Sequence, residues 1–141
     1  MAVSPPSAVV TRLYEDVWNG GSADEGEKLL APAFVGHMPG QAQLGRREYL
    51  DAVRAFRRGF PDLLLSIVDQ FTDDGTVVTE FVATGTHGGK IVGVPRTRKP
   101  IRFGGLALSH VEDGRITVQW DEWDRRVWLE QIGALPSISM L

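Results

Sequence analysis

The chain has 141 residues, of which 43% are hydrophobic and 23% charged, and a formal net charge of −3. This balance predicts one globular domain with a sizeable core and argues against a nucleic-acid or anionic-membrane partner. The absence of cysteines excludes disulfides and thiol catalysis, and no apolar run approaches the roughly 20 residues of a membrane span. The N-terminus also lacks the basic and apolar regions of a signal peptide, so we expect a cytoplasmic protein.

The first part of the chain predicts three helices. Apolar residues from Val9 to Trp18 recur at three-to-four spacing, which indicates an amphipathic helix that Ser4 or Ser7 caps and NGG (19–21) ends. A short helix is expected over 23–31, leading into PAFVGHMPG, and a third over 46–60, ended by Pro61.

After residue 61 the hydrophobic period changes to two, which is typical of strands. Strands are expected over 63–71, 76–87, 99–111 and 115–123, with a fifth, short strand over 89–94. The sequences DDG (73–75) and EDG (112–114) predict hairpin turns, and residues 125–136 predict a short amphipathic helix or turn.

Helices followed by a run of antiparallel strands form the α+β pattern. We therefore predict a cone-shaped roll, in which about three N-terminal helices lie on the concave face of a curved, mainly antiparallel sheet and enclose a pocket. A single domain over residues 1–141 is expected, with frayed ends at about 1–6 and 137–141. Apolar residues on the outer sheet face would favour a homodimer or homotetramer.

The stretch RITVQWDEWD (115–124) is the first candidate for chemistry. Strict alternation gives this strand one polar face, formed by Arg115, Thr117, Gln119 and Asp121. Because Trp120 and Trp123 bracket Asp121, an indole is expected to desolvate its carboxylate and raise its pKa. Such a carboxylate can take a proton from an activated carbon and return it elsewhere. The alternative is an ordinary polar strand end that faces solvent.

The three histidines are His37, His87 and His110, and none stands at a metal-binding spacing. We therefore expect no metal and no other cofactor. His37 precedes a Pro-Gly turn and His87 ends a strand before two glycines, and both positions suit the rim of a pocket. The alternative for each is an ordinary loop histidine.

Small residues recur inside the third long strand. One face of FGGLALSH (103–110) carries Phe103, Gly105, Ala107 and Ser109. This pattern either leaves room for a bulky ligand or permits a close backbone approach.

Several blocks of the chain, in order, resemble the SnoaL-like polyketide cyclases. They are YEDVWNGGSADEGEKLLAPAFVGHMPG, FPDLLLSIVDQFTDDGTVVTEFVATGTHGG, VEDGRITVQWDEWD and LEQIGALP, which together cover about residues 8 to 136. The resemblance implies the ketosteroid-isomerase-like cone. It also implies cofactor-free closure of the last ring of an aromatic polyketide by intramolecular aldol condensation, as in anthracycline biosynthesis.

The resemblance also implies roles for particular residues. The family's acid/base aspartate stands in the Trp-Asp pair that is here Trp120 and Asp121. Its histidine before the Pro-Gly loop corresponds to His37, and that of its Gly-Thr-His segment to His87. Tyr14 lies on the first helix, where relatives place pocket aromatics.

Two positions depart from the family pattern. Gln119 stands where many relatives have histidine before the Trp-Asp pair, and Ala107 stands where many carry a polar residue. Both changes remove contacts to a ligand, so they leave the substrate and the reaction type open. Related proteins hydroxylate anthracycline rings without a cofactor, and more distant ones open or cyclise epoxides.

We expect Asp121 to act as the base on a small-molecule aromatic polyketide, and either Asp121 itself or a neighbour such as His37 or His87 to return the proton. The expected substrate contacts are Tyr14, Trp18, Phe34, Phe56, Phe103, Ala107, Gln119 and Trp120. The alternatives are a cofactor-independent hydroxylase, an epoxide-transforming enzyme with an arginine and a second aspartate beside Asp121, and a binding or dimerising module without turnover.

Overall fold

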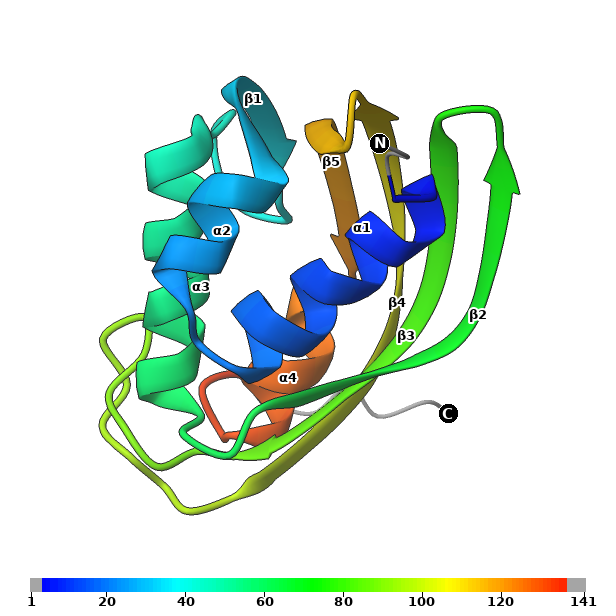
Figure 1. The fold of residues 1–141 in the computed structure, drawn as a ribbon. Coiled ribbons are helices and arrows are strands. Elements are labelled where there is room, and N and C mark those ends of the chain that lie inside the picture. The colour runs from blue at the N-terminus through cyan, green and yellow to red at the C-terminus, as the bar shows by residue number, and fades with distance from the viewer. Residues whose placement is uncertain (1–3, 137–141) are drawn as a thin grey trace.

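The computed structural model describes residues 4–136, which fold as a layer of helices on a five-stranded sheet (Figure 1). The helices are α1 (Pro6–Arg12), which continues as the π-helical segment η1 (Leu13–Asn19), then α2 (Ala23–Leu29), α3 (Arg46–Gly59) and α4 (Arg125–Gln131). The strands are β1 (Leu30–His37), β2 (Leu64–Asp73), β3 (Thr76–Thr86), β4 (Pro100–Glu112) and β5 (Arg115–Trp123). The sheet order is β1-β5-β4-β3-β2, in which β1 pairs with β5 in parallel and the other neighbours are antiparallel. The predicted α+β class is confirmed.

The predicted helices and the four long strands agree closely with the observed elements, but two strand expectations were wrong. Strand β1 was not expected, because Pro32 and Gly36 weaken its strand pattern. The strand expected over 89–94 is instead a tight turn, which a single bridge between Ile91 and Val94 closes.

The start of the first helix also differs from the expectation. Pro5 occupies the N-cap position of α1 and no side chain caps the helix, so neither Ser4 nor Ser7 has the expected role. Pro6 already belongs to the helix, while residues 1–3 and 137–141 lie outside the described part of the chain.

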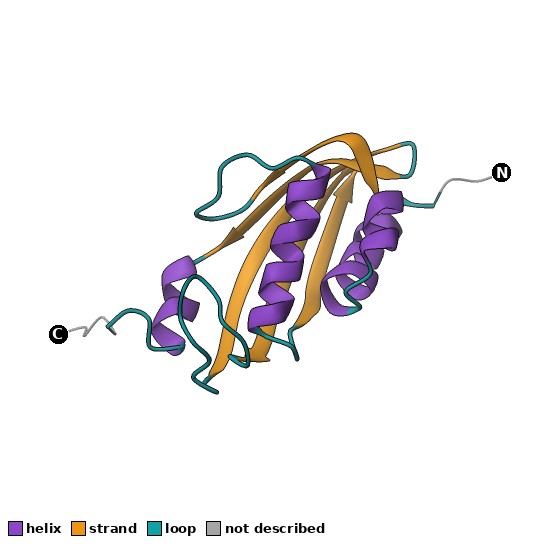
Figure 2. Ribbon diagram, turned by 90° about the vertical axis from the view of Figure 1, so that its left-hand side faces the viewer, coloured by secondary structure: helices purple, strands orange, loops and turns teal. Residues whose placement is uncertain are grey.

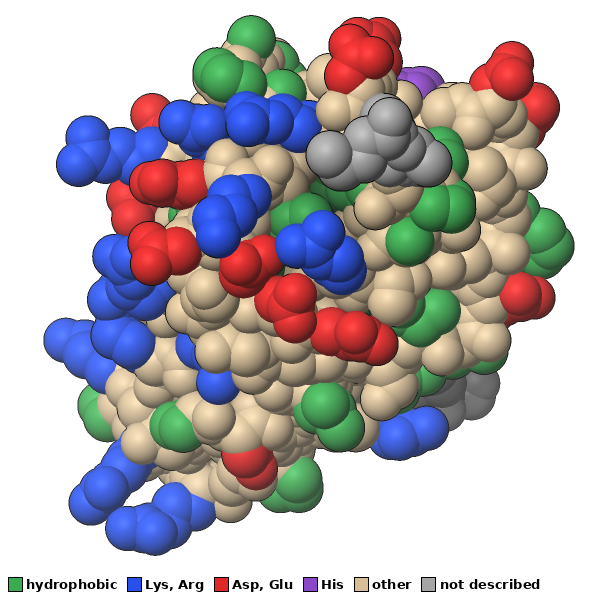
Figure 3. Space-filling view, viewed as in Figure 1, with side chains coloured by type: hydrophobic (Ala, Val, Ile, Leu, Met, Phe, Trp, Pro, Cys, Tyr) green, Lys and Arg blue, Asp and Glu red, His purple; other side chains and the backbone are tan. Residues whose placement is uncertain are grey.

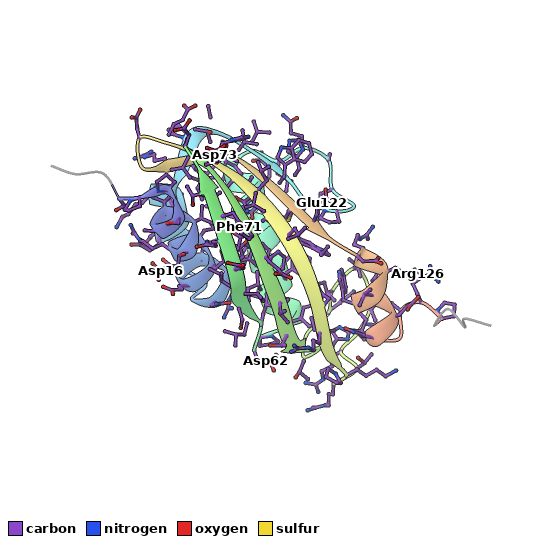
Figure 4. All side chains as sticks on the ribbon, turned by 90° about the vertical axis from the view of Figure 1, so that its right-hand side faces the viewer. Asp16, Asp62, Phe71, Asp73, Glu122 and Arg126 are labelled. Atoms are coloured by element: carbon purple, nitrogen blue, oxygen red, sulfur yellow. The ribbon has the colours of Figure 1, made fainter. Side chains whose placement is uncertain are left out.

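The helices cover one face of the sheet and leave the other face open. Figure 2 shows α1, η1, α2 and α3 on the concave side, and Figure 4 shows the convex side with no helix in front of it. The N-terminal helix buries its apolar stripe against the sheet through Val9, Val10, Leu13, Tyr14, Val17 and Trp18. No helix of the described residues is long and apolar enough to cross a membrane.

Strand register sets up a polar row inside this otherwise apolar interface. Asp121 on β5 pairs with Ala107 on β4, which pairs with Thr79 on β3, which pairs with Gln70 on β2. One step along, Ser109 pairs with Gln119. Paired residues on neighbouring strands share a face, so these side chains all lie on the helix-covered side.

A bulge changes the expected polar face of β5. The register shifts between His110 and Val111, so that Ile116 is fully buried and Arg115 is exposed. The inward polar face therefore contains Gln119 and Asp121 but not Arg115, because an extra residue on one strand reverses the alternation beyond it.

Opposite charges gather at the two ends of the sheet (Figure 3). The hairpin turns that join β2 to β3 and β4 to β5 carry Asp73, Asp74, Glu112 and Asp113, all exposed. The 88–99 loop at the other end carries Lys90, Arg96, Arg98 and Lys99, also exposed, and no acidic residue.

Candidate functional site

Asp121 lies in the interior of the cone and accepts two hydrogen bonds. The Tyr49 hydroxyl, from α3, donates to its Oδ2 at 2.6 Å, and the Gln119 amide donates to its Oδ1 at 2.9 Å. All three side chains are buried, and Asp121 itself is only 3% exposed. The carboxylate is therefore held in one orientation away from bulk water.

Gln119 is itself oriented by Ser109. The Ser109 hydroxyl donates to the Gln119 amide oxygen, which leaves the amide nitrogen of Gln119 to face Asp121. Because both residues are fully buried, the pair fixes a hydrogen-bond donor beside the carboxylate. Ala107 lies between the polar side chains of Thr79 and Asp121 in the register, and its methyl group contributes no polar contact.

Burial raises the pKa of Asp121 to about 6. The hydrogen bonds from Tyr49 and Gln119 act in the opposite direction, because they stabilise the ionised form, and the charge of Glu122 raises the pKa further. A carboxyl group with this pKa is ionised at neutral pH and still basic enough to remove a proton from an activated carbon.

Two buried phenols accompany the carboxylate. The pKa of both Tyr14 and Tyr49 is raised well above the ordinary value. The larger cause is burial, and the second is the negative charge of Asp121. Both therefore carry their protons at neutral pH. The Tyr14 hydroxyl makes no hydrogen bond of regular geometry, although the Thr79 hydroxyl lies near enough to lower its pKa slightly. Tyr14 is a neutral donor without a partner beside Asp121.

An aromatic wall stands next to this polar group. The Trp123 ring, two residues beyond Asp121, lies 6.4 Å from Trp18, 5.6 Å from Phe56 and 6.2 Å from Phe103, measured between ring centres. These four rings line a cavity together with Leu63, Leu65, Phe81 and Ala83. The cavity volume is about 10 Å³, which is room for at most one water molecule.

Most of the expected contact residues lie at or near this interior. Trp18, Phe56 and Phe103 line the apolar cavity, while Tyr14, Ala107 and Gln119 surround Asp121. Phe34 packs edge-on against Tyr49 at 5.1 Å and lies behind it.

His37 and Trp120 do not join Asp121. Their rings stack at 3.6 Å between centres on the convex side of the sheet, where Trp120 is 44% exposed. The alternation of β5 explains this, because successive side chains point to opposite faces. The structure thus gives no support to a ligand contact by Trp120 or to proton transfer between His37 and Asp121.

His87 is also apart from Asp121. His87 directly follows β3, which ends at Thr86, and lies eight positions beyond Thr79, the β3 residue in the row of Asp121. Because a strand advances about 3.3 Å per residue, His87 is far from Asp121 along the sheet. Its Nδ1 accepts the backbone N–H of Thr97 at 3.2 Å and lies 2.9 Å from the Thr97 hydroxyl. Nε2, which then carries the proton, is buried without a partner. The geometry is that of a loop anchor.

Three residues of the site were not identified from the sequence. Tyr49 lies inside the helix expected over 46–60 and was given no role, and neither Trp123 nor Ser109 was expected to act on a ligand. A buried tyrosine needs a hydrogen-bond partner, which is the one signal that could have drawn attention to Tyr49. Within residues 4–136, no three His, Asp or Glu side chains converge closely enough to hold a metal ion.

The protein is thus an α+β cone that holds, in its interior, one oriented carboxylate with a raised pKa. The family model of the SnoaL-like polyketide cyclases matches residues 8–132, so the chain belongs to this family. The resemblance seen in the sequence is confirmed. No protein of curated function matches the chain.

Solved structures agree with this assignment. IdmH from Streptomyces antibioticus, assigned as a polyketide cyclase, is 32% identical over 92% of this chain and 99% of its own, with a TM-score of 0.82. A protein from Acidithiobacillus ferrooxidans with the same assignment is 28% identical over 96% and 100%, with a TM-score of 0.77. AclR from Streptomyces galilaeus, assigned as a hydroxylase, is 21% identical over 95% and 84%, with a TM-score of 0.84, and shares the fold.

Proposed function

We propose that this protein closes a ring on an aromatic polyketide by a cofactor-independent, intramolecular aldol reaction with Asp121 as the general base. The observation that carries the proposal is the Asp121 carboxylate, which is buried, has a pKa of about 6 and is held by Tyr49 and Gln119. A base tuned close to neutral pH is the requirement for removing a proton from a carbon between two carbonyl groups.

The proposed reaction is an isomerisation, so it needs no oxidant or reductant. Asp121 takes the proton from the acidic carbon, and the resulting enolate forms a bond to the carbon of a second carbonyl group in the same molecule. The carbonyl oxygen takes up the charge and is protonated, which returns the proton that Asp121 removed. The proton comes from the protonated Asp121, and the Tyr14 hydroxyl, which is neutral and makes no hydrogen bond of regular geometry, is the candidate hydrogen-bond donor that stabilises the charge on this oxygen while it keeps its own proton.

The apolar wall supports a polycyclic substrate. The rings of Trp18, Phe56 and Trp123 offer flat apolar surface, and holding the reacting carbons together can contribute several kcal/mol to the lowering of the barrier. No arginine hydrogen-bonds to Asp121 or forms an ion pair with it among residues 4–136, so the arrangement expected for an epoxide hydrolase lacks support.

The test is anaerobic turnover of an anthraquinone-type polyketide, supplied as free acid and as methyl ester. Asp121→Asn and Asp121→Ala should lose at least about 10²-fold in rate, the usual contribution of a general base. Glu80→Gln is the matched control, because Glu80 is exposed and its strand partner is Leu106 on the convex face.

The other outcomes of this test would indicate a different function. Full activity of Asp121→Asn would refute the proposed base. Product that forms only with oxygen would indicate a hydroxylase, and tight binding with neither product would indicate a binding module.

A further inference from the structure

A second cleft lies on the other side of Phe56 from the apolar cavity. It is bounded by α3, α4, the turn after β1 and the 88–99 loop, and its volume is about 140 Å³. Its walls are mainly apolar, with Phe56, Ile91, Val92 and Trp128 among them. A pocket that holds a whole drug-sized ligand has roughly 300–1,000 Å³, so this cleft alone accommodates only part of a polycyclic molecule.

One cation interrupts these apolar walls. Arg125 lines the cleft, is exposed and has no carboxylate or hydrogen-bond partner among residues 4–136. The neighbouring acid, Asp124, is occupied at the N-terminus of α4, where it accepts the backbone N–H of Arg126. An unpaired guanidinium beside apolar surface fits a ligand that is apolar over most of its area and carries a carboxylate at one end.

Gly40 leaves room for this arginine. A Cβ atom at residue 40 would lie 2.4 Å from a guanidinium nitrogen of Arg125 and 2.7 Å from its Cδ, so the side chain rests directly on the glycine backbone. Gly40 also has a φ of 75°, which residues with a side chain rarely adopt. Two features of one turn thus leave space for Arg125 at the cleft.

Phe56 lies between the cleft and the apolar cavity. Its side chain lines both the cleft and the apolar cavity, whose wall includes Trp123, two residues beyond Asp121, so it forms a wall shared by the two spaces. It is half-buried, with rings of Trp18, Trp123 and Trp128 around it at 5.6–5.9 Å. The Phe56 side chain is therefore the shared boundary of the two spaces.

We propose that this cleft is the mouth of the site and that Arg125 selects aromatic substrates that carry a free carboxylate over their neutral esters. The inference rests on the proposed function, since it names the substrate class of the same site. The fused rings of the ligand pass Phe56 toward Asp121, and the carboxylate stays at the rim on Arg125.

Another arginine-lined groove is the competing candidate. It lies between η1 and α3, and Arg54, Arg57 and Arg58 line it. Arg57 already donates to the backbone oxygens of Trp18 and Leu63, and Arg54 lies 3.6 Å from Asp51. This groove does not share Phe56 with the cavity, so we favour the Arg125 cleft.

The test is a binding measurement that does not depend on turnover. Isothermal titration calorimetry compares anthraquinone-2-carboxylate with its methyl ester on the full chain and on Arg125→Gln, Arg126→Gln and Arg54→Gln. The wild type should bind the carboxylate about tenfold more tightly than the ester, as expected for one charge-assisted contact at a partly exposed site. Arg125→Gln should bind both alike, while Arg126→Gln, whose cation is paired with Glu130 outside the cleft, should keep the preference.

Three results would overturn the inference. They are a wild type that does not distinguish acid from ester, an undiminished preference in Arg125→Gln, and a preference that Arg54→Gln abolishes. None of them bears on whether Asp121 catalyses ring closure, and an inactive protein with an Arg125-dependent preference would refute only the proposed function.

Discussion

The ionised carboxylate of Asp121 is unfavourable for folding, because burial outweighs its two hydrogen bonds. Its pKa rises from the ordinary 3.8 to about 6 on folding. Between these values the native state keeps a proton that the unfolded chain has released, so stability falls as the pH rises through this window and the loss is complete above it. A difference of this size corresponds to about 3 kcal/mol at neutral pH.

Asp121→Asn should therefore be more stable than the wild type at pH 8 while it loses activity. Its amide oxygen can accept from Gln119 and its amide nitrogen can donate to the Tyr49 oxygen, so no hydrogen bond is lost. Urea unfolding at pH 8 and pH 4 measures the difference, which should nearly vanish at pH 4. Glu80→Gln should show no such pH dependence, and an Asn variant less stable than the wild type at pH 8 would contradict the argument.

Residue chemistry could be predicted for Asp121 but not for its partners. The Trp-Asp-x-Trp pattern indicated a desolvated carboxylate, and burial with a raised pKa bears this out. Strand alternation alone places Trp123 on the side of Asp121 and Trp120 on the opposite side, but sequence could not show that His37 of β1 stacks on Trp120, since that contact needs the parallel pairing of β1 with β5. Tyr49 is 72 positions from Asp121, and only the tertiary fold brings them together.

At the scale of elements, the 88–99 loop is attached to the sheet through one histidine. The loop has no helix or strand of its own beyond the bridge from Ile91 to Val94. His87 accepts from Thr97 through its side chain, and its backbone bonds to Lys99 and Arg98. A fully buried imidazole thus holds the 97–99 end of the loop, while the backbone N–H groups of Gly88 and Gly89 donate to Gly59 of α3 at its other end.

Replacing His87 with alanine should release this loop without unfolding the sheet. Trypsin should then cleave after Arg96 or Arg98 several-fold faster than in the wild type, because exposed, unanchored loops are the preferred sites of proteolysis. Mass spectrometry of timed digests locates the cuts. His110→Ala, on the exposed end of β4, is the control, and an unchanged cleavage rate in His87→Ala would show that other contacts hold the loop.

Whether a segment is a helix or a strand was easier to predict than which strands pair in the sheet. Periodicity identified α3 and the four long strands, since each has one clearly buried face. Strand β1 gave little signal, because its pairing with β5 joins segments about 85 residues apart and a parallel pair needs no turn sequence.

At the scale of the whole molecule, the convex sheet face is an uncovered apolar surface. Leu64, Val68, Phe71, Leu106 and Trp120 are each 44–64% exposed there, and Figure 4 shows Phe71 on this open side. One row of this face is apolar throughout, since Phe71 pairs with Val78, Val78 with Leu108 and Leu108 with Trp120. Exposed apolar surface of this kind marks an interaction site in soluble proteins.

We expect this face to join two copies of the chain. A stable dimer buries about 800 Å² on each partner, which the area of one sheet face can supply. Light scattering after size exclusion should give a dimer for the wild type and a monomer for Leu106→Glu, which places a third carboxylate between Glu80 and Glu122 in the register. Val92→Glu changes an equally exposed residue on the 88–99 loop and should stay dimeric, whereas a monomeric wild type would refute the expectation.

The opposite charges at the two ends of the sheet make the molecule an electric dipole despite a net charge of only −3. The positive pole is the 88–99 loop, which also forms one wall of the Arg125 cleft. An acidic ligand that diffuses toward the protein is thus steered to this end before it makes any contact, and added salt weakens that long-range attraction. The overall charge repels such a ligand, while the local field draws it to the mouth of the site.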